Sequence, residues 1–399
     1  MTKSPLLLLE ELFQKENPVI AGLMSGTSMD GLDIALCRIA RPSLFGEGGS
    51  GGGGWRIETL AARTAPMPDG VRPRIQRAME GDLVEAARLD IELGRWFADE
   101  TVALARESGL TVDLVGSHGQ TIYHEHGRTT LQIGEPGFLA NRLRCVVAHD
   151  FRRADVVLGG CGAPLVPIFD RLVLGRDHAA VLSVNIGGIA NLTILPPLRD
   201  SNEEPLAFDC GPGNMVIDRI MERRTDGRAL FDDGGQEAAL GQVDEGLLAE
   251  LMAHPFISAT APKSAGREQF GRDFTDGLIA KQAPASDEDW RDLLATVTAW
   301  TADCILAATG GQRIEHAYIA GGGARNATLM ARLEQGLGKG VIIDLRETGI
   351  DPDNKEALAF ALLARLLIDG EPGNVPRATG ASASGLMGRL TFPTEFTLD

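Results

Sequence analysis

The sequence has few basic residues, few cysteines and no long hydrophobic run. Lysines and arginines number 38 against 55 aspartates and glutamates, and the formal net charge is −17. Nucleic-acid binding depends on clustered positive charge, and no dense run of Lys or Arg occurs, which argues against nucleic acid as the main partner. The five cysteines include no CxxC pair and are odd in number, which indicates reduced thiols and a cytoplasmic protein.

Several familiar motifs are also missing. The apolar stretch at 6–13 is too short and too soon charged for a membrane span, and no small-residue cleavage site follows it. We therefore expect no membrane partner, and a short amphipathic helix at this position.

The absence of a GxxxxGKS or GxxxxGKT sequence excludes a Walker-type ATPase, and the absence of HRD and DFG excludes the protein-kinase scheme.

The sequence does contain a pattern that occurs twice. Each of the stretches 19–39 and 181–195 is an apolar run, a tight glycine-containing turn and a second apolar run, which predicts a hairpin. A glycine turn exposes backbone N–H groups against which a phosphate can lie. The repeat therefore predicts two similar halves that close on one nucleotide.

The order of elements predicts the fold class. A chain of 399 residues with 44% hydrophobic residues is long enough for two domains. We expect an α/β protein with the two-lobed fold of actin-like ATPases and sugar kinases, in which duplicated domains surround a nucleotide cleft. The expected lobes are 1–177, with a flexible glycine-rich insertion at 41–54, and 178–399, whose last segment 370–399 packs back on the first lobe. Beyond the hairpins, strands are expected at 55–65, 112–117, 131–133, 145–148, 206–209, 316–320 and 340–344, and helices at 71–80, 83–108, 136–143, 214–223, 245–254, 287–309, 326–337 and 352–368.

The first hairpin turn carries hydroxyls and carboxylates around two glycines. The residues that we expect to bind the nucleotide phosphates are Gly26, Thr27, Ser28, Met29, Asp30, Gly31, Leu32 and Asp33. Phosphoryl transfer needs N–H and O–H donors for the phosphate oxygens and carboxylates for Mg²⁺, so Asp30 and Asp33 are candidate metal ligands, directly or through water. The alternative is an ordinary Asp-Gly hairpin turn, which is less favoured because the second hairpin repeats the pattern.

Two further glycine-rich turns follow predicted strands in the second half. Asp209 ends a strand beside such a turn, where a carboxylate can reach a substrate, although an N-cap or turn aspartate is an equal alternative. Gly321, Gly322 and Gly323 lie between a strand and a helix, and three residues without side chains would let a flat adenine or ribose approach the backbone. Taken alone, this second turn is a weak signal.

A dense polar cluster ends another predicted strand. Ser117, His118 and Gln120 are suited to hydrogen bonds with a sugar-like substrate. Zinc binding by His118, His124 and His126 is less favoured, because their spacing matches no standard motif and no HExxH sequence is present.

Two basic segments leave alternatives open. Arg152 or Arg153 could hold a substrate carboxylate in a bidentate pair, although a surface salt-bridge cluster is slightly favoured. Lys263 lies in a loop-like segment before a helix, where a phosphate-binding or structural role competes with the default of a solvated lysine.

Taken together, these motifs resemble those of the anhydro-N-acetylmuramic acid kinase family, which belongs to the hexokinase–actin–heat-shock-chaperone ATPase superfamily. The resemblance is more specific than any one motif, because the segments follow one another over nearly the whole chain. They are GLMSGTSMDGLD (22–33), GSHGQTIYH (116–124), QIGEP (132–136), DFRRADVVLGGCGAPLVP (150–167), NIGGIANLT (185–193), FDCGPGN (208–214), PKSAGRE (262–268) and GGGARN (321–326).

The resemblance implies an ATP-dependent kinase that phosphorylates O6 of 1,6-anhydro-N-acetylmuramic acid while water opens the anhydro bridge at C1. The products would be N-acetylmuramic acid 6-phosphate and ADP, in the recycling of a cell-wall sugar. Asp209 would be the base that activates water, and we expect it to stay ionised at neutral pH. Arg152 would hold the lactyl carboxylate of the sugar. The remaining implied contacts are Ser117, His118 and Gln120 with the sugar, and Gly187, Gly188, Gly321, Gly322, Gly323 and Glu356 with ATP, with Mg²⁺ near the first turn.

The resemblance also favours a homodimer. Rival hypotheses are a kinase of the same fold with another substrate, a nucleotide-gated or chaperone ATPase, an actin-like polymer and a metal-dependent hydrolase that uses the three histidines. The chaperone hypothesis is weakened because two lobes leave no part of the chain for a peptide-binding domain.

Overall fold

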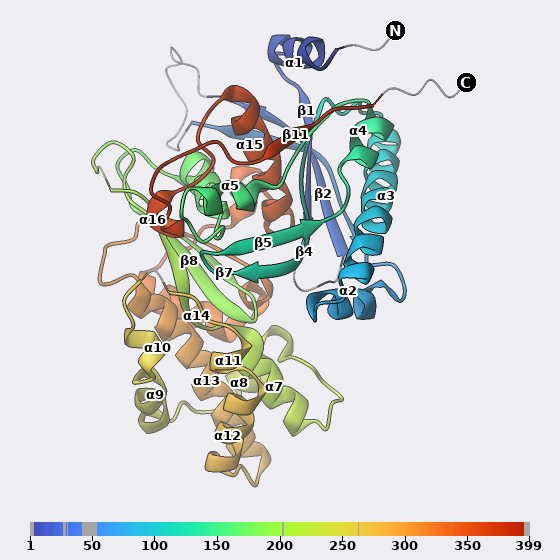
Figure 1. The fold of residues 1–399 in the computed structure, drawn as a ribbon. Coiled ribbons are helices and arrows are strands. Elements are labelled where there is room, and N and C mark those ends of the chain that lie inside the picture. The colour runs from blue at the N-terminus through green and yellow to red at the C-terminus, as the bar shows by residue number, and fades with distance from the viewer. Residues whose placement is uncertain are drawn as a thin grey trace. The chain divides into compact units, whose positions relative to one another are not determined.

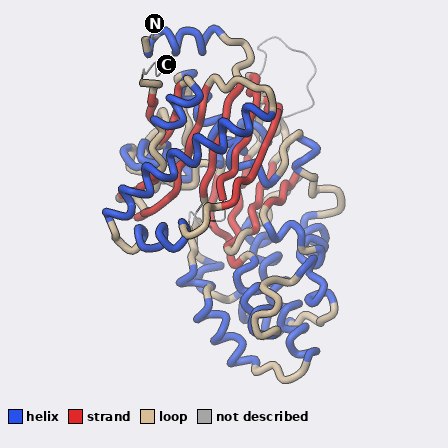
Figure 2. The backbone as a smooth tube through the Cα atoms, turned by 90° about the vertical axis from the view of Figure 1, so that its right-hand side faces the viewer, coloured by secondary structure: helices blue, strands red, loops and turns tan. Residues whose placement is uncertain are grey.

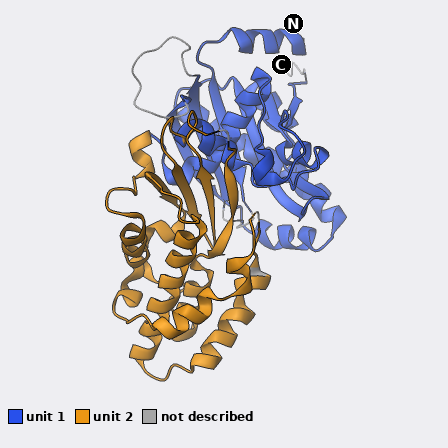
Figure 3. Ribbon diagram, turned by 90° about the vertical axis from the view of Figure 1, so that its left-hand side faces the viewer, with its two compact units in different colours: residues 1–174, 349–399 blue, residues 175–348 orange. Residues whose placement is uncertain are grey.

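A computed structural model describes residues 4–26, 29, 31–41, 54–201, 203–261 and 263–394, so most of the glycine-rich insertion lies outside the described residues. The chain divides into two compact units: unit 1 comprises 1–174 and 349–399, and unit 2 comprises 175–348 (Figure 3). The expected lobes of 1–177 and 178–399 differ from these units, because residues 349–369 belong to unit 1. The physical reason is helix α15 (Lys355–Asp369), which packs on the sheet of unit 1.

The sheet of unit 1 contains the first predicted hairpin. Its strands are β1 (Val19–Ser25), β2 (Gly31–Ala40), β3 (Arg56–Pro66), β4 (Leu114–Glu125), β5 (Thr129–Ile133), β6 (Val146–His149) and β11 (Arg389–Thr391). β1, β2 and β3 form an antiparallel meander, while β4 runs parallel to β1 and β6 runs parallel to β4. The order across the sheet is β11-β6-β4-β1-β2-β3. β5 is paired to β4, and the two lie side by side in Figure 1.

Helices cover both faces of this sheet, which explains why every residue of β1 is buried. Helix α3 (Leu83–Glu107) begins at Asp82, whose side chain accepts the N–H of Glu85, and it packs Leu89, Leu93 and Phe97 into the core at helical spacing. α15 contacts β1, β2 and β4. Other helices of unit 1 are α1 (Pro5–Gln14), α2 (Val71–Met79), α4 (Gly137–Leu143), α5 (Phe151–Val157), α6 (Val166–Phe169), the π-helical turn Asp170–Leu174, the 3₁₀ turn Pro352–Asn354 and α16 (Pro376–Thr379).

Unit 2 repeats the strand order of unit 1. Its strands are β7 (Val181–Ile186), β8 (Ile189–Leu195), β9 (Leu206–Pro212) and β10 (His316–Ala320), in the order β10-β7-β8-β9. The pairings match those of β4-β1-β2-β3, since β7, β8 and β9 are an antiparallel meander and β10 runs parallel to β7. Ile342 also makes a parallel bridge to Ala317, as β6 does to β4. The predicted duplication and the predicted α/β fold class are therefore confirmed.

The helices of unit 2 gather around α13 (Asp287–Ala308). Ser286 and Asp289 form a reciprocal capping box at its start, and Trp300 is fully buried at its centre. Figure 2 shows the helix-rich part of the unit below its strands. The other helices are α7 (Asn214–Arg224), α8 (Gln236–Ala239), α9 (Glu245–Met252), α10 (Pro255–Ser258), α11 (Arg267–Phe270), α12 (Arg272–Gln282) and α14 (Ala327–Leu337), with 3₁₀ turns at Asp233–Gly235, Gly322–Arg325 and Leu345–Thr348.

Three predicted elements differ from the structure. The strand expected at 112–117 is the longer β4, because β5 pairs with the polar segment that follows it. The strand expected at 340–344 is reduced to the bridge at Ile342. The helix expected from Pro352 is a 3₁₀ turn followed by α15, and the Asp351 side chain caps the turn through the N–H of Asp353.

In the part of the chain that the structure describes, the helices are too short or too polar to cross a membrane.

Candidate functional site

The turn between β1 and β2 is held by two fully buried side chains. Ser25 Oγ donates to Gln120 Oε1 at 2.7 Å, and Gln120 Nε2 donates to the carbonyl of Gly26 at 3.1 Å. Ser25 Oγ also lies 3.2 Å from the carbonyl of Gly31. Because both amide atoms of Gln120 are engaged, this residue supports the turn, and the sugar contact expected for it stays a prediction.

Within the turn itself, Thr27, Ser28 and Asp30 lie outside the described residues. Met29 has a left-handed φ of 55°, and its carbonyl accepts hydrogen bonds from Nε and Nη2 of Arg72 at 3.0 and 2.9 Å. The Leu32 side chain is fully buried, so it would reach a nucleotide only through its backbone. Arg72 was not found from the sequence, because it approaches the turn from α2.

Asp33 continues β2 and pairs with Thr64 of β3. Its Oδ1 accepts a hydrogen bond from Thr64 Oγ1 at 2.6 Å, which fixes the orientation of the carboxylate. Such a carboxylate provides the hard oxygen that Mg²⁺ prefers. Asp33 thus fits the expected metal site chemically. The glycine at position 31 is explained by packing, since a Cβ there would lie 2.4 Å from the carbonyl of Ala65.

Arg152, which is half-buried, contacts the buried His118 in unit 1. Arg152 Nε lies 2.7 Å from His118 Nε2, and because arginine can only donate, Nε2 must be the unprotonated ring nitrogen. The proton therefore sits on Nδ1, which donates to the carbonyl of Gly119 at 2.7 Å. Burial, and then the charge of Arg152, lower the pKa of His118 to about 3, so the ring is neutral at physiological pH. His118 positions Arg152 and has both ring nitrogens engaged.

The guanidinium of Arg152 is fixed from a second direction by the loop that follows α5. Its Nη1 donates to the carbonyl of Gly162 at 3.0 Å. Burial lowers the pKa of Arg152, while the charges of Glu356 and Asp155 raise it. Arg153, the alternative candidate, instead pairs with Asp150 at 3.4 Å, and its side chain is 40% exposed. Of the two candidates, Arg152 is therefore the one with a fixed guanidinium, and its contact with a carboxylate stays a prediction.

Ser117 and Glu356 differ in accessibility. The Ser117 side chain is buried, and its Oγ has no hydrogen-bond partner among the described residues. It alternates with His118 along β4, so the two side chains leave opposite faces of the strand. Glu356 is exposed in the first turn of α15 and acts electrostatically on Arg152. Their expected contacts with the sugar and with ATP stay predictions.

The zinc alternative finds no support. The rings of His124 and His126 lie 5.9 Å apart edge to face, but His118 uses both nitrogens in other hydrogen bonds. Over the described residues, no group of three or more His, Cys, Asp or Glu side chains could hold a metal ion.

Asp209 is anchored within β9 in unit 2, because this strand continues to Pro212, past the end predicted at 209. A bulge opposite Ala190 and Asn191 interrupts the pairing of β8 and β9 next to Asp209. Its Oδ2 accepts hydrogen bonds from Ser264 Oγ at 3.0 Å and from the N–H of Ala265 at 2.8 Å. The equal alternative of an N-cap aspartate is wrong, because the N-cap of α7 is Gly213 and no side chain caps this helix.

Residues 263–265 were not predicted to touch Asp209. Only Lys263 of the PKSAGRE motif is named as a candidate from the sequence. The same motif contains Ser264 and is the sequence feature that could have pointed to it. The ammonium of Lys263 donates to the carbonyls of Phe256 and Ile257 at 2.6 and 2.7 Å, so the default of a solvated lysine is wrong.

The second hairpin turn is bound to the start of α7. The carbonyl of Gly187 accepts the N–H of Asn214 at 2.7 Å, and the carbonyl of Gly188 accepts those of Gly213 and Met215 at 3.0 and 3.1 Å. The α7 amides at 214 and 215 are thus already used by the turn. Phosphate binding at Gly187 and Gly188 stays a prediction.

The Gly321–Gly323 turn packs against the end of β7. A Cβ at Gly321 would lie 2.5 Å from Asn185 Oδ1, and one at Gly323 would lie 2.2 Å from the Ile186 side chain. Gly322 is exposed and has more room, with only Asn214 Nδ2 at 3.3 Å. Packing therefore explains two of these glycines, and Gly322 is best placed for the close approach of a ligand.

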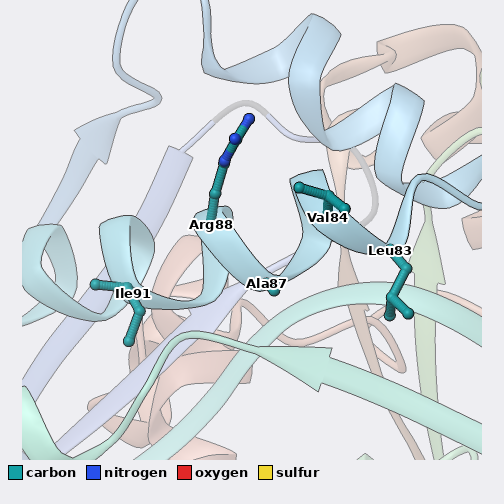
Figure 4. A pocket seen from close by; sticks show the side chains of 5 residues that line it. All are labelled: Leu83, Val84, Ala87, Arg88 and Ile91. Carbon is teal, nitrogen blue, oxygen red and sulfur yellow. The ribbon is translucent and has the colours of Figure 1, made fainter.

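A surface hollow of about 560 Å³ on α3 contains none of the expected site residues. Its lining is Leu83, Val84, Ala87, Arg88 and Ile91, which all come from this one helix (Figure 4). The candidate site residues therefore lie outside this hollow.

A sheet duplicated in this strand order, with a glycine turn at each hairpin, defines the class of two-lobed, actin-like α/β kinases. Comparison with known proteins narrows that class. The family model described as anhydro-N-acetylmuramic acid kinase matches residues 18–393, and the chain belongs to this family. The resemblance expected from the motifs, and the expectation of a kinase, are confirmed.

Curated relatives agree over nearly their full length. An anhydro-N-acetylmuramic acid kinase from Caldanaerobacter subterraneus subsp. tengcongensis is 38% identical over 96% of this chain and 98% of its own. One from Bacillus cereus is 38% identical over 94% and 99%. A solved ROK family glucokinase from Streptomyces griseus has a TM-score of 0.36 at 12% identity, over 87% of this chain and 99% of its own. This TM-score is too low to support an argument about the fold, which rests on the strand order.

Proposed function

We propose that this protein uses ATP to phosphorylate O6 of 1,6-anhydro-N-acetylmuramic acid while water opens the anhydro bridge, giving N-acetylmuramic acid 6-phosphate and ADP in the recycling of a cell-wall sugar. The observation that carries the proposal is the Asp209 carboxylate of β9, which two hydrogen-bond donors hold in place. The family of the chain supplies the substrate class.

The proposed reaction needs one base. A water oxygen bonds to C1 as the C1–O6 bond breaks through an oxocarbenium-like state, and the water proton passes to Asp209. O6 bonds to the γ-phosphorus as the bond between that phosphorus and ADP breaks. Ordinary glycosidases protonate the departing oxygen with a second carboxylic acid. Because the phosphoryl group captures O6 here, a single aspartate suffices.

Arg152 is proposed to bind the lactyl carboxylate of the sugar. Its Nε and Nη1 are directed by His118 and Gly162, and no described residue is recorded as an acceptor for Nη2. A guanidinium that is fixed in this way loses little side-chain entropy on binding, and a carboxylate can accept from Nη2 and from the second Nη1 hydrogen.

ATP and Mg²⁺ are assigned to the first turn. Backbone N–H groups at 26–33 would bind the phosphates, and Asp33, with Asp30 outside the described residues, would hold Mg²⁺ directly or through water. Bound Mg²⁺ neutralises phosphate charge. The assignment is supported by the hydrogen bonds that hold the turn in place, which involve Ser25, Gln120 and Arg72.

We further propose that the protein acts in the cytoplasm as a homodimer. Use of ATP and five free thiols favour a reducing, ATP-containing compartment. Light scattering after size-exclusion chromatography would test the dimer, because a mass near 42.4 kDa would contradict it.

A coupled ADP-release assay, run with and without 1,6-anhydro-N-acetylmuramic acid, tests the reaction. We expect turnover only with the sugar, and we expect Asp209→Asn to lower kcat by about 10²-fold or more while nucleotide binding survives. ADP release without sugar, or none with it, would reject the proposed function. Near-normal turnover of Asp209→Asn would assign the base to another residue.

A further inference from the structure

The loop between α10 and α11 contacts Asp209 in three ways. The carbonyl of Lys263 accepts the backbone N–H of Asp209 at 3.0 Å. The hydroxyl of Ser264 and the N–H of Ala265 both donate to Asp209 Oδ2, at 3.0 and 2.8 Å. Consecutive residues thus hold both the backbone and the side chain of Asp209.

The loop is itself anchored by the Lys263 side chain. Its ammonium donates to the carbonyls of Phe256 and Ile257 in α10 and lies 4.7 Å from the centroid of the Phe256 ring. The ring of Phe208, the residue before Asp209, lies 5.9 Å away. Lys263 therefore ties α10 to the loop immediately beside Asp209, and at least two of its three donors are occupied.

Hydrogen bonds to a carboxylate stabilise its ionised form and fix its direction. A base that must take a proton from water at neutral pH needs both properties. Cys210 and Lys263 are two titratable groups beside Asp209. Burial raises the pKa of the Cys210 thiol to about 12, so this group does not titrate in the acid range.

We propose that Lys263, Ser264 and Ala265 form a positioning segment that keeps Asp209 ionised and aimed, with Ser264 as the hydroxyl donor and Lys263 as the anchor. This inference rests on the proposed role of Asp209 as the base. In this proposal the PKSAGRE segment positions Asp209 and does not need to contact phosphate.

The first test is Ser264→Ala, at an exposed position where loss of folding is not expected. Loss of one hydrogen bond to the carboxylate should lower kcat roughly three- to tenfold and leave KM for the sugar unchanged. The acid limb of the kcat profile should move to higher pH by about 0.5 to 1 unit, and Ser264→Thr should restore it. A fall in kcat with no movement of the acid limb would overturn the proposal.

Lys263→Met tests the anchor, and Lys281→Met is its matched control. Lys281 pairs with Glu250 on the surface of the same unit. We expect Lys263→Met to move the acid limb in the same direction as Ser264→Ala, and Lys281→Met to leave the profile unchanged. Equal effects of the two lysine variants would show that the anchor is not specific.

A readout without turnover separates this inference from the proposed function. The Asp209 carboxyl can be titrated by ¹³C NMR in the whole protein, with its signal assigned by the difference from Asp209→Asn. A higher pKa of this carboxyl in Ser264→Ala supports the positioning role even if the wild-type protein fails to phosphorylate the sugar. An unchanged pKa in an active enzyme rejects the positioning role and leaves the proposed function standing.

Discussion

His118 and Arg152 illustrate how a single proton decides a role. The arginine donates to Nε2, so the imidazole must carry its proton on Nδ1, and burial with the neighbouring positive charge keeps it neutral. A histidine suited by type to bind a sugar is instead used to direct an arginine. The residue types predicted a polar site around His118 and Arg152, but only their hydrogen bonds show which residue directs the other.

Removal of the Arg152 guanidinium should weaken sugar binding in particular. Arg152→Ala is expected to raise KM for the sugar about 10- to 100-fold with little change in KM for ATP, because a charge-assisted bidentate pair is lost. Arg152→Lys should not restore KM, since one ammonium cannot replace the planar fork that contacts His118 and Gly162 together.

Arg153→Ala is the matched control on the same helix. Arg153 pairs with Asp150 and has no recorded contact with His118 or Gly162, so both KM values should remain as in the wild type. A rise in KM for ATP, rather than for the sugar, in Arg152→Ala would refute the carboxylate assignment.

At the scale of elements, α15 joins unit 1 because glycines let it approach the sheet. A Cβ at Gly22 of β1 would lie 1.8 Å from the carbonyl of Ala357, and one at Gly116 of β4 would lie 2.1 Å from that of Phe360. The helix backbone thus lies directly on two neighbouring strands. His118 of β4 packs on the Phe360 ring with centroids 4.6 Å apart, so the same contact supports the Arg152 pair.

Gly22→Ala should therefore destabilise the protein strongly. The clash is with backbone, which cannot rotate away, and we expect a loss of about 3 kcal/mol or more in the free energy of unfolding. Chemical denaturation measures it. Gly277→Ala in α12, where a Cβ meets no atom within 4 Å, should instead stabilise by about 0.5–1 kcal/mol. A Gly22→Ala variant as stable as the wild type would contradict this account of α15 packing.

At the scale of the whole molecule, stability should depend on the protonation of Asp218. This carboxyl lies in α7, and burial raises its pKa to about 7. The unfolded chain releases this proton near pH 4, so the folded state binds more protons between about pH 4 and 7, and stability falls as pH rises through that range.

Asp218→Asn removes the titrating group. We expect its unfolding temperature to equal that of the wild type near pH 4 and to exceed it by about 2–4 °C at pH 8, corresponding to about 1 kcal/mol after allowance for partial exposure. Calorimetry at the two pH values measures the gap. A gap for Asp218→Asn that is the same at both pH values would refute the buried-carboxyl account.

Much of the architecture could be read from local patterns. Apolar runs around glycine turns predicted both hairpins, and helical spacing predicted α2, α3, α7, α13 and α14 to within two residues. The ordered motifs also predicted the family. These features depend on neighbouring residues, so a single sequence is sufficient to show them.

The sequence by itself therefore determined the hairpins, the duplicated α/β order and the family of this protein. Tertiary structure alone decided that α15 belongs to unit 1, that Gln120 and His118 support other residues, and that Ser264 and Ala265 hold Asp209. The physical reason is how far apart along the chain the contacting residues lie. Periodicity and turn chemistry are local, whereas a backbone approach across more than 300 residues, or a hydrogen bond across 55, appears only when distant segments pack together.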